Sequence, residues 1–152
     1  MSTELLSRVA PFDAMSDADR ATLAGLLEAH SFAPGQNVYG AGDPSIGMKM
    51  LVSGTVVLTD VTLTTLSTDP EVRIDRPGTL FSLGSLLMPF AHRHNVKAAT
   101  EVEILLLPRR RFQRLIETGD SAGHRLLDHL LVRLAGNVRT LNQAIHDLLT
   151  HE

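Results

Sequence analysis

Two histidines one residue apart, His92 and His94, are the side chains in this sequence best spaced to bind a metal ion. Imidazole is a common metal ligand, and residues two apart share a face when they lie in a strand. A zinc site needs three or four ligands, and no cysteine and no obvious acidic partner accompany the pair. We therefore expect no metal site and interpret this segment as a solvated loop.

Other catalytic patterns are also missing. No Gly-x-Ser-x-Gly elbow and no His-Glu-x-x-His motif occur, and Ser85 has no candidate base to activate it. Gly40 and Gly42, followed by Gly47, do not have the spacing of a dinucleotide-binding loop. We expect no catalytic residue and a protein that is not an enzyme.

Arg109, Arg110 and Arg111 form a basic run with Arg114. Binding to nucleic acid would need a helix or strand that contacts the bases, and none follows this run. The formal net charge of the chain is -3, which also does not favour nucleic acid. The run is interpreted as a solvated helix face, with contact to an acidic protein partner as the alternative.

The composition is that of a globular protein of 152 residues, with 43% hydrophobic and 20% charged residues. This length suits one domain with an appended helix. The sequence contains no cysteine and begins without a basic and apolar signal segment. No apolar run approaches the roughly 20 residues of a membrane helix. A cytoplasmic location without membrane contact is expected.

The sequence predicts helices at both ends of the chain and strands between them, and these elements must position any functional site. Ser16 before acidic residues is typical of a helix start, and helical structure is predicted over residues 3–29. Short β-branched segments between turn residues then favour a sandwich or barrel-like roll of about eight strands. Strands are expected at 48–52, 55–61, 72–74 and 96–107, a hairpin tip or mobile loop at 62–70, and a short helix at 109–117.

The sharpest periodic signal lies near the C-terminus, where apolar residues alternate at spacings of four and three. β-Branched residues at heptad position a with leucine at d favour two parallel helices. The alternative is an amphipathic helix that lies on its own domain, and both arrangements can hold together. We predict a homodimer through a long helix, with its interface at Leu127, Leu131, Leu134, Val138, Leu141, Ile145 and Leu148.

The segment from Gly42–Asp43–Pro44 to Ser53–Gly54 resembles the strand and turn of cyclic-nucleotide-binding domains. The order of the remaining parts is similar too, with the Pro77–Gly78 turn, Phe112 and a final long helix. The resemblance covers nearly the whole chain and implies a mainly β jelly roll with N-terminal helices, as in catabolite-activator-like proteins. It assigns residues 1–118 to the roll with its flanking helical pieces, and residues 119–152 to a long dimerisation helix of the same unit.

In that family a phosphate-binding cassette holds the ligand, and the resemblance places it at residues 78–87. The family's glutamate, which grips the ribose hydroxyl, corresponds to Leu83, and an unpaired buried hydroxyl costs about 1–3 kcal/mol. The arginine that pairs with the phosphate corresponds to Arg93, or to His92 if the alignment gap between this chain and the family is placed differently. The candidate ligand-binding residues implied by the resemblance are Ser82, Leu83, Gly84, Ser85, Arg93 and Asn137.

These departures leave three possibilities open: weak binding of a cyclic nucleotide, binding of another anion, or a vestigial pocket. The apolar sequence favours a vestigial pocket, filled by Leu83, Leu86, Leu87, Met88 and Phe90. We interpret the chain as a non-enzymatic regulatory or sensory module without a cofactor, acting as a homodimer on an unknown protein partner. The alternative is a working cyclic AMP or cyclic GMP receptor whose ligand repositions the C-terminal helix. No helix-turn-helix follows the long helix, so no DNA-binding domain is expected.

Overall fold

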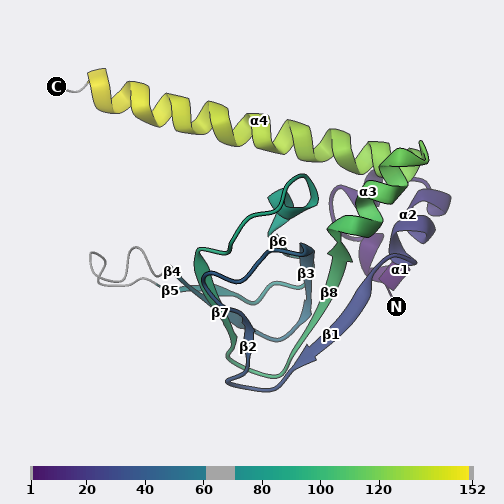
Figure 1. Ribbon diagram of the computed structural model, residues 1–152, viewed down its shortest axis with the longest axis horizontal. Helices are drawn as coiled ribbons and strands as arrows, with labels where there is room; N and C mark the ends of the chain where they lie inside the picture. The colour runs from purple at the N-terminus through teal and green to yellow at the C-terminus, as the bar shows by residue number, and fades with distance from the viewer. Residues whose placement is uncertain (1, 61–70, 151–152) are drawn as a thin grey trace.

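The computed structural model describes residues 2–60 and 71–150, in which helices flank a β-roll (Figure 1). The chain begins with α1 (Ser2–Leu6), a short 3-10 helix η1 (Phe12–Ala14) and α2 (Asp17–Ala24). It ends with α3 (Arg109–Glu117) and the long α4 (Ser121–Thr150). Between them lie β1 (Glu28–Phe32), β2 (Asn37–Tyr39), β3 (Gly47–Ser53), β4 (Val56–Asp60), β5 (Glu71–Ile74), β6 (Leu80–Phe81), the 3-10 helix η2 (Leu83–Leu86), β7 (His94–Ala98) and β8 (Val102–Pro108).

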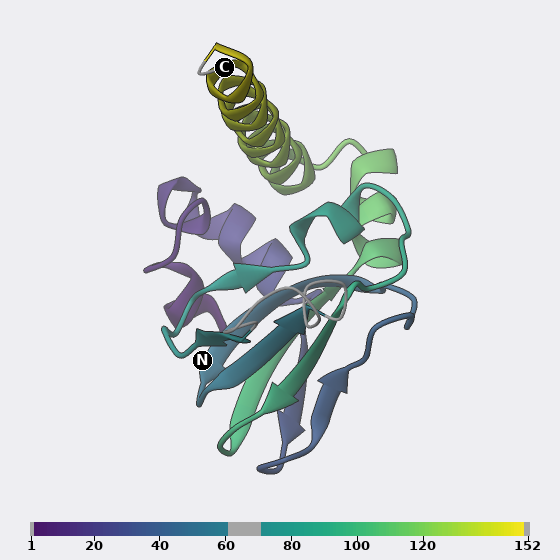
Figure 2. The same ribbon diagram turned by 90° about the vertical axis from the view of Figure 1, so that its left-hand side faces the viewer.

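The strands form two four-stranded sheets, in the orders β1-β8-β3-β6 and β2-β7-β4-β5. Every strand pair in the described residues is antiparallel, and most neighbours in a sheet are distant in sequence. Figure 2 shows the roll that results, with α4 running to one side of it. This arrangement is a jelly roll, so the predicted fold class is confirmed. The role of α4 in dimerisation stays a prediction.

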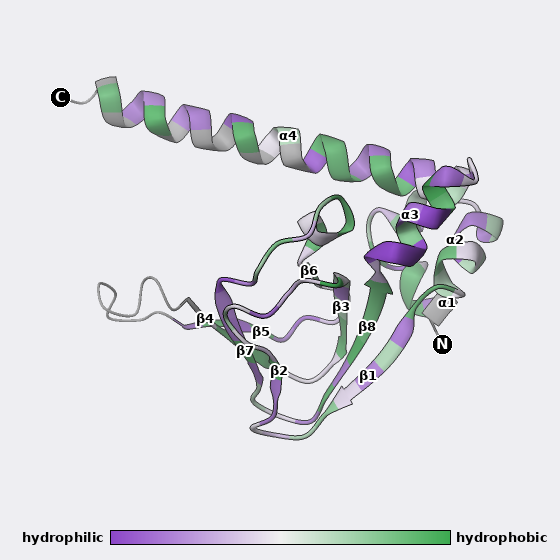
Figure 3. Cartoon of the chain, in the orientation of Figure 1, coloured by the Kyte–Doolittle hydropathy of each residue, from purple (hydrophilic) through white to green (hydrophobic). Residues whose placement is uncertain are grey.

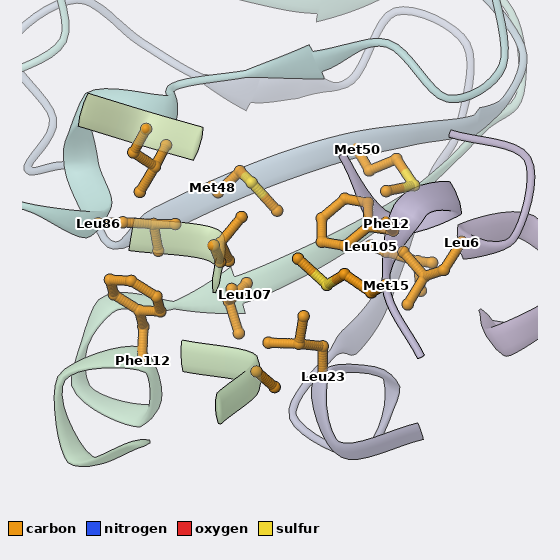
Figure 4. Close-up of a cluster of buried hydrophobic side chains, with 13 residues drawn as sticks. Leu6, Phe12, Met15, Leu23, Met48, Met50, Leu86, Leu105, Leu107 and Phe112 are labelled. Atoms are coloured by element: carbon orange, nitrogen blue, oxygen red, sulfur yellow. The ribbon is translucent and has the colours of Figure 1, made fainter. Parts of the chain in front are cut away.

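The central strands β3 and β8 are covered on both faces. Because side chains alternate along a strand, Met48 and Met50 join the core that packs under the helices (Figure 4). Leu51 and Ile104 instead face the second sheet and form a separate core with residues such as Val96. Burial on both faces explains the unbroken apolar run Ile104–Leu107 in β8, which is usual for strands without a solvent face.

Two predicted boundaries are wrong. The helical segment expected over residues 3–29 ends at Ala24, and Glu28 already pairs with Leu106 as part of β1. The expected strand at 96–107 is two strands, β7 and β8, which lie in different sheets. In contrast, the predicted cap is confirmed, because the Ser16 side chain accepts a hydrogen bond of 3.1 Å from the Asp19 amide. The hairpin tip predicted at 62–70 lies outside the described residues.

The basic run is not simply a solvated helix face, as the sequence suggested. Arg109 donates hydrogen bonds to the carbonyls of Ser45 (3.0 Å) and Ser85 (3.1 Å), and so ties the start of α3 to η2. Arg111 donates to the Leu26 carbonyl and forms an ion pair of 3.1 Å with Glu28. Arg109 and Arg111 therefore connect α3 to other segments of the fold, because each forms hydrogen bonds or an ion pair with residues distant in sequence.

The base of α4 is attached to α2. The Asp19 carboxylate accepts a hydrogen bond of 2.6 Å from Ser121 and lies 3.3 Å from Nε of Arg125. Leu126 and Leu130 bury the inner face of the first turns. Beyond this region α4 extends away from its base at α2 and α3, and apolar and polar bands alternate along it (Figure 3). No helix in the described ranges is long and apolar enough to cross a membrane.

We predict that Gly47→Ala destabilises the protein by about 2 kcal/mol or more, since overpacking a filled core is costly. A Cβ at Gly47 would lie only 2.0 Å from the Leu107 carbonyl oxygen, where the strands β3 and β8 meet. The matched control is Gly136→Ala in α4, where nothing lies within 4 Å. That change should stabilise by roughly 0.5–1 kcal/mol. Urea unfolding measures both, and equal effects would contradict the close strand packing.

Candidate functional site

The segment predicted to be the cassette, residues 78–87, contains β6 and a turn that forms η2 before the chain continues to β7. Ser82 has a left-handed backbone (φ 60°) and starts η2, and the hydroxyl of buried Ser85 donates to the Ser82 carbonyl at 2.7 Å. The Ser85 carbonyl accepts from Arg109, as described above. The turn is therefore held by hydrogen bonds from both inside and outside the segment.

A cavity of about 520 Å³ lies beside this turn. Its volume falls in the range of pockets that bind small molecules. The wall combines aromatic and apolar side chains with polar groups, and it is formed by β2, β4, β6, Ser82 and the segment from Phe90 to His94. It is lined by Tyr39, Leu58, Phe81, Ser82, Phe90, Ala91, His92, Arg93 and His94.

A stack of rings forms one wall of the cavity. The rings of Tyr39 and His92 lie 3.7 Å apart between centroids and 22° from parallel, and Phe90 meets His92 edge-on at 5.5 Å. The Lys49 ammonium lies 4.8 Å from the centre of the Tyr39 ring, a cation–π contact. Lys49 is 7% exposed, and its Nζ has no hydrogen-bond partner among the described residues.

Burial controls the ionisation of these groups. Desolvation lowers the pKa of Lys49 to about 8, and it also lowers the pKa of His92, which the Lys49 charge lowers further. The nearby Asp43 carboxylate works against this shift of the His92 pKa, while His94 adds to it. Burial raises the pKa of Tyr39, opposed by its hydrogen bond with Ser82. At neutral pH the ring stack therefore contains a neutral His92 imidazole, near the buried Lys49 cation that lies behind the Tyr39 ring.

The structure separates the residues predicted to bind a ligand. Ser82 and Arg93 line the cavity. Leu83 packs against the core under the helices, and Ser85 is buried and used in the turn, so neither lines the cavity. Gly84 also lies outside its lining. The side chain of Asn137 lies outside the described residues.

The pocket is not filled in the way that the apolar sequence suggested. Leu83, Leu86 and Leu87 belong to the helix-side core, and Met88 is exposed. Phe90 does line the cavity, which remains open. The expectation failed because η2 turns its leucines toward the helices, and sequence alone does not show which side of the turn they face.

Sequence reasoning missed Tyr39, which lines the cavity, and Lys49, which contacts the Tyr39 ring without lining the cavity. Both lie in strands of the roll, far in sequence from the cassette, and no local motif marks them. A lysine within the apolar run from Gly47 to Val52 was the available signal, because a charged residue rarely occupies a buried strand position. Its alternation with Met48 and Met50 places it on the inner face of the roll.

The histidine pair is also placed differently from the solvated loop that was expected. His92 is buried in the ring stack, and His94 lines the same cavity. Across residues 2–60 and 71–150, no three His, Asp or Glu side chains gather as a metal site would require. The two imidazoles are therefore best considered as part of the cavity wall.

A jelly roll with a cassette turn, a cavity beside it and a long following helix is the architecture of a regulatory class of domain. The family model for the cyclic nucleotide-binding domain matches residues 29–119, and the chain belongs to this family. Domains of this family are regulatory rather than catalytic. The resemblance seen in the sequence is thereby confirmed.

Solved structures share the fold. The N-terminal domain of a transcriptional regulator from Streptomyces coelicolor A3(2) is 25% identical, with a TM-score of 0.70 over 93% of this chain and 94% of that one. A putative cyclic nucleotide-binding protein from Geobacter metallireducens GS-15 is 19% identical, with a TM-score of 0.68 over 91% and 98%. A cyclic AMP-bound structure of PfPKA-R is 21% identical, with a TM-score of 0.65 over 96% of this chain and 45% of that chain. A search of curated proteins found no match.

We predict that Lys49→Met stabilises the protein at pH 7 by up to about 3 kcal/mol, because a pKa shift of one unit corresponds to about 1.4 kcal/mol. Below pH 8 both folded and unfolded chains carry the charge, and its burial costs stability in full. Between pH 8 and 10.5 the unfolded chain binds more protons, so the stability of the original protein rises and the difference disappears. Urea unfolding at pH 7 and pH 10 measures this.

The control is Lys97→Met, on the outward face of β7, where the side chain is exposed. It should change the free energy of unfolding by no more than about 0.5 kcal/mol at either pH. A loss of stability in Lys49→Met at pH 7 would contradict the cost assigned to the buried ammonium.

Proposed function

We propose that this chain is a non-enzymatic regulatory module whose cavity does not hold a cyclic nucleotide in the family's usual way. It acts as a homodimer through contacts with a protein partner, and the cysteine-free sequence suits a reducing compartment such as the cytoplasm. The observation that carries the proposal is the ring stack. Buried His92 lies in the cavity wall with Tyr39 and Phe90 against its ring, whereas Arg93, which also lines the cavity, is exposed.

Two family contacts are weakened by these residues. A neutral His92 offers a cyclic phosphate no charge-assisted hydrogen bond, whereas an arginine would offer two. Leu83 cannot accept a hydrogen bond from the ribose, and it packs into the helix-side core. Hydrogen bonds to charged groups contribute about 1.5–3 kcal/mol each. Their combined loss corresponds to at least about a 100-fold weaker complex.

The direct test is calorimetry with cyclic AMP and cyclic GMP at pH 7. We expect no heat of binding at micromolar ligand and at most weak binding at millimolar ligand. A dissociation constant in the micromolar range for either nucleotide would overturn the proposal in favour of a working receptor. The cavity of about 520 Å³ with Arg93 on its wall, and the cyclic AMP found in PfPKA-R, are what support that alternative.

We predict that His92→Arg increases affinity for cyclic AMP at least about ten-fold, because it places a phosphate donor on the cavity wall. Leu83→Glu should give no gain, because residue 83 packs against the helix-side core and does not line the cavity. Arg93→Ala in the His92→Arg variant is the control, because it shows whether Arg93 or the introduced arginine holds the phosphate. Calorimetry measures all three variants, and no gain in His92→Arg would mean that further contacts are missing.

The exposed face of α4 supports the proposed homodimer. Val138 is 56% exposed and Ile145 is 54% exposed, and Leu131 at the same heptad position is exposed too. Leu127 instead packs against the chain's own core, so the proposed seam begins near Leu131. The side chains of the remaining interface positions, Leu134, Leu141 and Leu148, lie outside the described residues.

We predict that Val138→Lys with Ile145→Lys converts the dimer to a monomer in sedimentation velocity, because two charges at position a would face their copies across the seam. The control is Val132→Lys, a residue 72% exposed that lies at position b, away from the seam. That variant should remain dimeric. A dimer that survives the double change would show that the chains pair elsewhere.

A further inference from the structure

Three arginines surround a second hollow, of about 290 Å³, where the N-terminal segment, the turn before β6 and α4 meet. Arg8 comes from the turn after α1, Arg76 from the turn after β5, and Arg133 from the second third of α4. The rest of the lining is short or apolar: Val9, Ala10, Pro77, Gly78, Thr79 and Leu80. Positive charge from three separate segments is therefore directed at one place.

The floor of this hollow is fixed by close packing. Gly78 has φ +90°, and a Cβ there would lie 2.6 Å from Cγ2 of Val9, so the N-terminal segment lies directly on the turn. The Arg76 carbonyl accepts hydrogen bonds from both the amide (3.2 Å) and the hydroxyl (2.7 Å) of Thr79. The backbone that carries Arg76 is thus held in one conformation beside the hollow.

The charges of the hollow are poorly balanced within the chain. No Asp or Glu lines it. Arg8 forms an exposed ion pair of 3.2 Å with Glu4. Within the described part of the chain, the guanidinium groups of Arg76 and Arg133 make no ion pair. Guanidinium groups match the geometry of phosphate oxygens and bind them by paired hydrogen bonds.

We propose that this hollow binds the phosphate group of a phosphorylated ligand, held by Arg76 and Arg133 with help from Arg8. The site is separate from the cavity of the roll, because Leu80 lines the hollow while the next residue, Phe81, lines the cavity from the opposite face of β6. A bound phosphate would link α4 to the roll. Arg133 lies at heptad position c, so pairing of the helices leaves it accessible.

The test uses inorganic pyrophosphate as the probe, titrated into the full chain by calorimetry at low salt. We expect saturable binding that Arg76→Ala and Arg133→Ala each weaken at least about ten-fold, as expected for a lost charged hydrogen bond. Arg73→Ala in β5 and Arg139→Ala in α4 are matched controls, since each removes one exposed arginine from the same region without touching the hollow. They should weaken binding less than about two-fold. Circular dichroism confirms that each variant is folded.

A second arm distinguishes a free ligand from a lipid headgroup. The chain is sedimented with vesicles that contain phosphatidic acid. Binding to the vesicles that is lost in Arg76→Ala and Arg133→Ala would place the phosphate on a membrane lipid. Binding of pyrophosphate without binding to the vesicles would indicate a free ligand. Equal weakening by all four substitutions, or no pyrophosphate binding at millimolar concentration, would overturn the site. Because the cavity of the roll is not involved, the result does not depend on the cyclic nucleotide titrations.

Discussion

The burial of β3 and β8 on both faces is the constraint on which the rest of the structure depends. Every second residue of these strands packs under the helices, and the others face the opposite sheet, so two cores share one pair of strands. A change at one core therefore acts on the other through the backbone between them. The close approach of Gly47 to the Leu107 carbonyl shows how little space separates the two strands.

Local signals in the sequence were enough for much of this fold. The Ser16 cap, the helix at residues 109–117 and the long final helix follow from short-range patterns of capping and periodicity. Glu28 to Phe32 was missed because an edge strand with an exposed middle has neither helical nor alternating apolar spacing. The split between β7 and β8 was missed because only residues 99–101 separate the two strands, and no glycine or proline marks the turn between them.

The site was less predictable, since it is built from contacts between distant segments. The family resemblance located the cassette, and it left His92 and Arg93 as alternatives for one position. The structure places His92 in the buried ring stack and leaves Arg93 exposed on the cavity wall. Lys49 and Tyr39 could not be assigned to the site from spacing, because only the closure of the roll brings β2 and β3 beside the cassette.

The helix α4 is attached to the rest of the domain near its N-terminal end, so its direction is set by contacts at that end. Asp19 holds Ser121 and Arg125 at the base, while the helix continues for 30 residues, or about 45 Å at 1.5 Å per residue. A rotation of about 5° at the base would then move the far end by about 4 Å. Because of this length, the direction of α4 is very sensitive to the packing of α2 and α3 at its base.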